Sequence, residues 1–215
     1  MFGKQANPHG QGHGAFPAAD SARGFDFGAA MRSFARQLLR QIPDLGHIDL
    51  DRCVFAVSQA RNRSQFGVFA SCTPLRFEDG LLTGRRHGRL YRMQQVVNPD
   101  GVDPLYIVTF FLPRFMDLPA AEKVETVIHE LWHIGPKFDG DLRRYPGRYY
   151  AHGRSGANDF DTEVKTLTRE WERTWGDNWV PDFFRQTFNE LHQQRGPIFG
   201  VKAPRPKLLP VSGAA

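Results

Sequence analysis

The sequence has little cysteine, no long hydrophobic run and little net charge away from its ends. Two cysteines, Cys53 and Cys72, are too few for a disulfide framework, and we expect both to be buried free thiols. The longest apolar stretch, residues 105–112, is far shorter than the roughly 20 residues of a membrane-spanning helix. Residues 1–14 lack the apolar run of a secretory signal. We therefore expect a cytoplasmic protein with no membrane partner.

The formal net charge of +5 is concentrated at the two ends of the chain. Residues 1–24 carry a net charge of +1 and residues 195–215 one of +4, which leaves zero for residues 25–194. The basic composition is thus weak support for a nucleic-acid-binding domain. The basic turn at residues 85–89 is interpreted as a solvated hairpin tip rather than a phosphate clamp.

Composition divides the chain into three parts. Residues 1–24 are rich in Gly, Pro and His without a period, which predicts a disordered arm. Residues 195–215 combine proline with basic residues and are predicted to be an extended or mobile tail. Residues 25–194 have enough apolar material to form one domain with its own core.

The hydrophobic pattern of this domain predicts an α+β fold, a compact unit in which a small, mostly antiparallel sheet packs against helices. Phe27, Met31, Phe34 and Leu38 follow helical spacing and predict a helix over residues 26–41. Further helices are predicted at 119–134, 159–175 and 181–193. Strands are predicted at 53–57, 66–70, 89–96 and 105–112, with turns that suit antiparallel connections.

The run His129-Glu130-Leu131-Trp132-His133 carries the strongest chemical signal. Residues four apart in a helix lie one above the other, so His129 and His133 can present two imidazoles to one zinc ion. Glu130 lies on the next column, within reach of a water at that ion without being a ligand. The apolar residues of the same helix lie opposite, which predicts that the histidines face a cleft or solvent.

A catalytic zinc site usually has a third protein ligand. His152, in a loop after the helix, is our first candidate. Zinc would activate water for attack on an amide, and Glu130 would serve as general base. Nearby donors could stabilise the oxyanion of the tetrahedral intermediate. The competing third ligands are Asp139, Asp141, Asp159, Asp161 and Glu163, and the oxyanion candidates are Tyr149, Tyr150 and Arg154.

These residues resemble a known group of enzymes. The run from Leu105 to His152 contains the motif, then Asp139-Gly140-Asp141-Leu142-Arg143, then a His-Gly pair. It resembles the metallopeptidases of phages and prophages, and it is similar to the SprT-like zincins, over residues 50–170. The resemblance implies a zincin fold with zinc on His129, His133 and His152 and with Glu130 as general base. It also implies that the strand before the motif helix lies near the cleft, where a sheet edge pairs with the substrate.

Two departures limit this resemblance. The four-cysteine zinc ribbon that often accompanies SprT-like domains is missing, so their DNA-linked role does not transfer. Pro136 and Asp139 stand where the longer metzincin motif requires glycine and histidine, so that subgroup is excluded.

The sequence therefore predicts a zinc-dependent metallopeptidase that acts on a peptide or protein substrate. The alternative is a zincin-like binding protein with a structural or vestigial metal, which contacts nucleic acid through its basic C-terminal tail. Nothing in the sequence indicates a particular oligomeric state.

Overall fold

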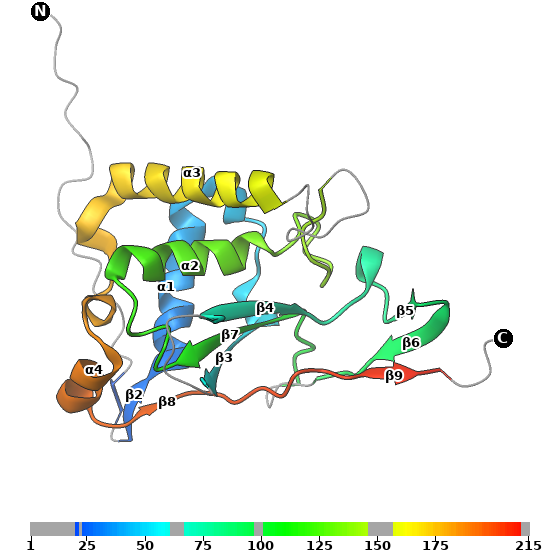
Figure 1. Cartoon of the computed structure of the whole chain (residues 1–215), viewed down its shortest axis with the longest axis horizontal. Coiled ribbons are helices and arrows are strands. Elements are labelled where there is room, and N and C mark those ends of the chain that lie inside the picture. Colours follow the sequence, from blue (N-terminus) through cyan, green and yellow to red (C-terminus); the bar gives the residue numbers. More distant parts are fainter. Residues whose placement is uncertain (1–19, 22, 61–66, 97–100, 146–156, 212–215) are drawn as a thin grey trace, which may run out of the picture.

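A computed structural model describes residues 20–21, 23–60, 67–96, 101–145 and 157–211 (Figure 1). They form the mixed α+β fold that the sequence predicts. The helices are α1 (Phe27–Gln41), α2 (Ala120–Trp132), α3 (Ala157–Trp175) and α4 (Phe188–Arg195). Short 3-10 helices are η1 (Pro43–Leu45), η2 (Leu50–Arg52), η3 (Glu78–Gly80), η4 (Gly176–Trp179) and η5 (Asp182–Arg185).

The strands make three small sheets of three strands each within the described residues. Their orders are β3-β7-β4, β1-β2-β8 and β5-β6-β9. The strands are β1 (Asp20–Ser21), β2 (Gly24–Asp26), β3 (Cys53–Gln59), β4 (Ala70–Pro74), β5 (Thr83–Arg86), β6 (Arg89–Met93), β7 (Tyr106–Leu112), β8 (Ile198–Phe199) and β9 (Leu208–Pro210).

The central sheet is mixed, because β7 pairs in parallel with β3 and antiparallel with β4. A mostly antiparallel sheet was predicted, and the parallel β3-β7 pair departs from it. These two strands are not neighbours in the chain. The long connection between them contains β4 and the β5-β6 hairpin, and so lets β7 return in the same direction as β3.

The second predicted strand, at 66–70, is misplaced. The structure has β4 at Ala70–Pro74, with Ala70 opposite Phe110 and Pro74 opposite Tyr106. Residue 66 lies outside the described residues, and Val68 is 57% exposed. The apolar run is therefore not the paired segment, because the strand is defined by its register with β7 and not by its own hydrophobicity.

Helix α1 confirms the predicted apolar stripe. Phe27, Met31, Phe34 and Leu38 are all fully buried, and Asp26 caps the helix by accepting a hydrogen bond from the Ala29 N–H at 3.0 Å. Helix α3 runs beside α2 in Figure 1. The motif helix α2 is therefore enclosed between the central sheet and α3.

The last predicted helix, at 181–193, is two elements in the structure. Residues Asp182–Arg185 form η5, and α4 begins only after Thr187. The Thr187 hydroxyl accepts a hydrogen bond from the Glu190 N–H, and the Glu190 carboxylate accepts one from the Thr187 N–H. This capping box starts a new helix and interrupts the apolar pattern that the sequence suggested was continuous.

The C-terminal stretch up to residue 210 contains two strands and also pairs with the central sheet. It supplies β8 and β9, and between them the Val201 carbonyl accepts a hydrogen bond from the Val57 N–H of β3 at 2.8 Å. The outer edge of β3 is therefore covered at this point. The three-part division of the chain stays a prediction. Within the described residues, no helix has the length and apolar character needed to span a bilayer.

A buried lysine ties α2 to the C-terminal elements. Lys123 is 1% exposed, and its Nζ donates hydrogen bonds to the carbonyls of Phe184 and Gln186 at 2.8 and 2.7 Å. Burial lowers the pKa of Lys123 to about 8 from its ordinary value of 10.5. The two carbonyls lie at the end of η5, so the lysine supplies donors that the broken helix lacks.

Replacing Lys123 with methionine should destabilise the protein, because two buried carbonyls lose their donor. We expect the free energy of unfolding, measured in urea at pH 7, to fall by about 1–3 kcal/mol. The exposed Lys165→Met on α3 is the control and should cost less than about 0.5 kcal/mol.

The lowered pKa of Lys123 predicts that the stability of the protein depends on pH. The folded protein releases the Lys123 proton near pH 8, whereas the unfolded chain holds it to about 10.5, so the unfolded state binds more protons between these values. This lysine therefore makes wild-type stability rise from pH 8 to pH 10 relative to Lys123→Met. An identical pH profile for both proteins would contradict the assignment.

Candidate active site

Helix α2 places the three predicted motif residues at its carboxyl end. His129 and Glu130 lie in its last turn, and His133 is the C-cap residue with helical backbone angles. The His133 N–H donates to the His129 carbonyl at 3.2 Å, so the turn stays closed. As a result the two Nε2 atoms lie 3.2 Å apart.

This separation fits a shared metal ion. Two nitrogen ligands of a tetrahedral zinc, each about 2.0–2.1 Å from the ion, lie about 3.3 Å from each other. The imidazoles of His129 and His133 thus have the spacing of neighbouring zinc ligands, and imidazole nitrogen is a preferred zinc donor. The donor set of the helix fits the metal.

The apolar stripe of α2 is confirmed, but the opposite face is less open than the sequence suggested. Ile128 and Leu131 are fully buried, as predicted. His133, which we expected to face a cleft or solvent, is only 6% exposed. Phe160 of α3 stacks on its ring at 4.5 Å and meets the His129 ring edge to face at 4.9 Å. The second helix therefore covers the imidazole pair.

Glu130 turns away from α3 and toward β4. Its side chain is 6% exposed, and its carboxylate accepts a hydrogen bond from the Cys72 backbone N–H. Burial raises the pKa of Glu130 to about 8, against the opposing effect of that hydrogen bond. A carboxyl group with a pKa near neutrality can both take up and release a proton at physiological pH.

A cavity of about 410 Å³ opens beside His129 and Glu130. It lies between α2 and the start of β4, so both of these predicted site residues reach it. Its wall combines apolar and acidic side chains. The lining residues are Phe69, Ala70, Leu118, Glu122, Glu125, Thr126, His129 and Glu130.

The free sheet edge beside this cavity belongs to β4. The resemblance implied that the strand before the motif helix provides this edge, but that strand, β7, has neighbours on both sides. The carbonyl of Phe69 accepts from the Phe111 N–H, and the Leu75 N–H donates to the Leu105 carbonyl. Because residues of a strand alternate, the backbone groups of Ala70 and Cys72 point away from β7. Ala70 lines the cavity, and the Cys72 N–H donates to Glu130.

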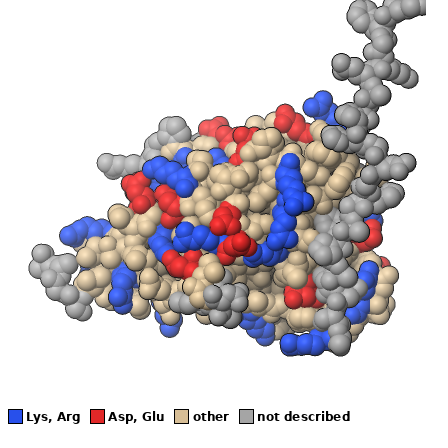
Figure 2. All heavy atoms as spheres, turned by 180° about the vertical axis from the view of Figure 1, so that it is seen from behind, with Lys and Arg blue, Asp and Glu red and all other residues tan. Residues whose placement is uncertain are grey.

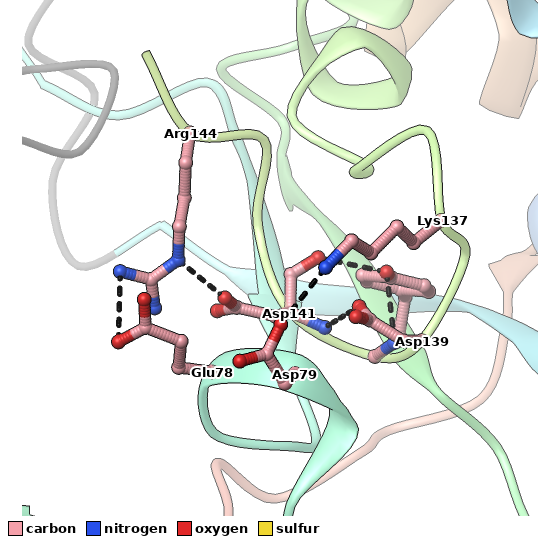
Figure 3. A network of polar contacts seen from close by, with 8 residues as sticks. Glu78, Asp79, Lys137, Asp139, Asp141 and Arg144 are labelled. Atoms are coloured by element: carbon pink, nitrogen blue, oxygen red, sulfur yellow. Dashed lines mark hydrogen bonds and ion pairs between the residues drawn. The ribbon is translucent and has the colours of Figure 1, made fainter. Parts of the chain in front are cut away.

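The aspartates proposed as alternative ligands lie in a separate polar network (Figure 3). Asp141 accepts a hydrogen bond from Arg144 Nε at 2.6 Å, and Asp139 accepts one from the Asp141 N–H at 3.1 Å. Lys137 forms an ion pair with Asp79 at 2.8 Å in the same network. The two aspartates thus form bonds within the loop after α2, while Lys137 and Arg144 of this loop pair with Asp79 and Glu78 of η3.

Glu163 also has a structural role. Its carboxylate accepts hydrogen bonds from Trp132 Nε1 at 3.0 Å and from the Tyr145 hydroxyl. Asp159 and Asp161 are exposed on α3. Among the residues that the structure describes, no three His, Cys, Asp or Glu side chains are grouped so that they could hold a metal ion. None of the five carboxylates therefore completes the histidine pair.

Sequence reasoning missed Arg143, which closes the carboxyl end of α2. Its backbone N–H donates to the His133 carbonyl at 2.7 Å, and its Nε donates to the Trp132 carbonyl at 2.8 Å. Its guanidinium also lies 3.6 Å from the centre of the Trp132 ring. A cation soon after a predicted helix end was the available signal, since such residues often satisfy the last carbonyls.

The remaining predicted site residues lie outside the described residues. These are His152, the third-ligand candidate, and the oxyanion candidates Tyr149, Tyr150 and Arg154.

A model of the family described as "Putative phage metallopeptidase" matches residues 29–179, which is 151 of the 215 residues. The matched range contains all but the first two residues of α1, the central sheet and the whole of α2 and α3. Comparison with curated proteins and with solved structures finds no match.

The packing of Phe160 on the two imidazoles predicts that its loss destabilises the folded protein. Phe160 is fully buried, so Phe160→Ala should lower the free energy of unfolding by about 3–5 kcal/mol, measured by urea unfolding in the presence of a chelator. Phe160→Leu keeps most of the volume and should cost less than about 2 kcal/mol. The exposed Val201→Ala is the control. A loss for Phe160→Ala no greater than for the control would show that α3 does not cover the histidines in solution.

Proposed function

Because the chain belongs to this family of phage metallopeptidases, we propose that it is a zinc-dependent peptidase in which His129, His133 and His152 bind the metal and Glu130 is the general base. The observation that carries the proposal is the 3.2 Å separation of the two Nε2 atoms, of which the His129 atom belongs to a residue that lines the same cavity as Glu130. A peptide or protein is the expected substrate.

The described flanks of the segment containing His152 support its place as third ligand. Before this segment, the Tyr145 hydroxyl accepts a hydrogen bond from Trp132 Nε1, next to His133. After it, Phe160 stacks on the His133 ring. The chain therefore leaves and returns beside the histidine pair. Residues 146–156 contain one histidine, which is His152.

When bound, zinc lowers the pKa of a coordinated water toward about 7 and polarises a substrate carbonyl. The carboxylate of Glu130 takes the proton of the attacking water and delivers it to the nitrogen of the leaving amine. Its buried position on the wall of the cavity suits this transfer. Tyr149, Tyr150 and Arg154 stay our proposed donors to the oxyanion.

The edge of β4 is the proposed binding site for the peptide backbone. Ala70 lines the cavity, and its backbone groups point to the open side of the sheet. An extended peptide can add to such an edge by main-chain hydrogen bonds. That position brings its scissile carbonyl past Glu130 and His129, which line the same cavity.

Zinc content tests the metal ligands. Zinc-loaded wild-type protein should retain about one equivalent after dialysis, measured by atomic absorption, whereas His129→Ala and His133→Ala should each reduce this at least tenfold. His192→Ala on the exposed face of α4 is the control. Unchanged zinc content in both site variants would remove the proposed site. His152→Ala tests the third ligand in the same way: it should lower the zinc content if His152 binds the metal.

Glu130→Gln should keep zinc and lose about 10²–10⁴-fold in the rate of hydrolysis, because the amide cannot accept the proton of water. The assay is cleavage of a quenched fluorescent peptide library, and Glu125→Gln in the same cavity is the control. Full activity in Glu130→Gln would remove this residue as general base while leaving the zinc site intact. Zinc-loaded wild-type protein that cleaves no peptide would favour the binding-protein alternative.

A further inference from the structure

Sheet β5-β6-β9 brings together two basic stretches that are far apart in the chain. Strands β5 and β6 form a hairpin ribbon in which Arg86 pairs with Arg89, and His87 and Gly88 make the turn with positive φ angles of 49° and 77°. Strand β9 adds to the other side of β6. Figure 1 shows this sheet at the end of the molecule opposite α4 and β8.

The ribbon carries several exposed cations. Arg85, Arg86, Arg89 and Arg92 are all exposed, and residues 81–96 contain no aspartate or glutamate. In the described part of the chain, none of these four arginines forms an ion pair with a carboxylate. Lys207, just before β9, is a further exposed cation. In Figure 2 the margin of the molecule at this sheet shows blue side chains among uncharged residues.

The register places the arginines on both faces of the ribbon. Arg85 lies opposite Leu90, and Arg92 lies opposite Thr83, so these two arginines share one face. Arg86 and Arg89 pair with each other on the other face, because side chains alternate along each strand. The ribbon is therefore cationic above and below its plane.

We propose that this ribbon docks in the major groove of duplex DNA, which is an activity beyond the proposed peptidase. A flat anionic surface would neutralise only one face of the ribbon. A groove has a row of phosphates on each wall and would contact both faces. The end of the hairpin beyond Tyr91–Met93, which pair with β9, is two-stranded. The major groove of B-form DNA, about 12 Å wide, admits such a two-stranded ribbon, whereas the deep and narrow major groove of duplex RNA does not. Guanidinium groups also match phosphate in geometry.

The test is binding of the full-length protein to a fluorescent 20-base-pair DNA duplex, measured by anisotropy at several salt concentrations. The variant R85Q/R86Q/R89Q/R92Q should bind at least tenfold more weakly at 100 mM salt. Its salt dependence, the slope of log K against log salt, should be smaller by about 3 to 4, because each phosphate contact contributes about 0.9. The matched control R36Q/R40Q/R169Q/R173Q removes four exposed arginines from α1 and α3 and should keep the wild-type slope.

Two half variants test the groove geometry. R85Q/R92Q and R86Q/R89Q should each lower the slope by about 2 if both faces contact phosphates. Circular dichroism checks that each variant is folded. The proposal is overturned if wild-type protein does not bind the duplex, if only one half variant has an effect, or if the control loses as much affinity as the ribbon variant. It is equally overturned if duplex RNA or phosphatidylserine vesicles bind as tightly as DNA.

Discussion

The orientation of α2 about its own axis is the constraint on which the candidate active site depends. Three sides of this helix have different partners: Ile128 and Leu131 pack into the core, the Glu130 carboxylate meets the Cys72 N–H of β4, and the imidazoles lie under Phe160. Consecutive residues are about 100° apart around a helix, so one rotation must satisfy all three contacts. The buried apolar stripe sets that rotation, and the positions of the polar groups follow from it.

The end of α2 is held as firmly as its sides. The carbonyls of Trp132 and His133 lie at the end of the helix, where intrahelical donors are lacking. Arg143 donates a hydrogen bond to each of them. The Arg143 guanidinium lies over the Trp132 ring, and Trp132 Nε1 donates a hydrogen bond to Glu163 of α3. His133 lies next to this arrangement in the chain, so its backbone cannot unwind without breaking bonds to two other elements. A residue at a helix terminus, where fraying is usual, thus has a defined position, as the proposed metal site requires.

The sequence alone predicted the features that follow from the helical repeat within one segment. Phe27 to Leu38 on α1 and the spacing of His129 and His133 on α2 are confirmed, because helical geometry relates residues three or four apart. The parallel pairing of β3 with β7, the shift of β4 to Ala70–Pro74 and the β4 edge beside Glu130 depend on contacts between distant residues, and no local pattern encodes them. Glu163 shows the same limit. A glutamate is a possible metal ligand, but the Glu163 carboxylate accepts hydrogen bonds from Trp132 and Tyr145, which come from another part of the chain.

The net charge of the domain does not describe the local charge of its surface. Residues 25–194 sum to zero, so the basic composition was weak support for a nucleic-acid-binding domain. Electrostatic attraction is screened over about 8–10 Å at physiological salt, so a ligand experiences the local charge and not the total. In the fold, Glu78 and Asp79 are paired with Arg144 and Lys137, whereas the ribbon arginines lie beyond them with β9 alongside. The two acids nearest to the hairpin in sequence are therefore paired with other cations, and the hairpin keeps its positive charge on the surface.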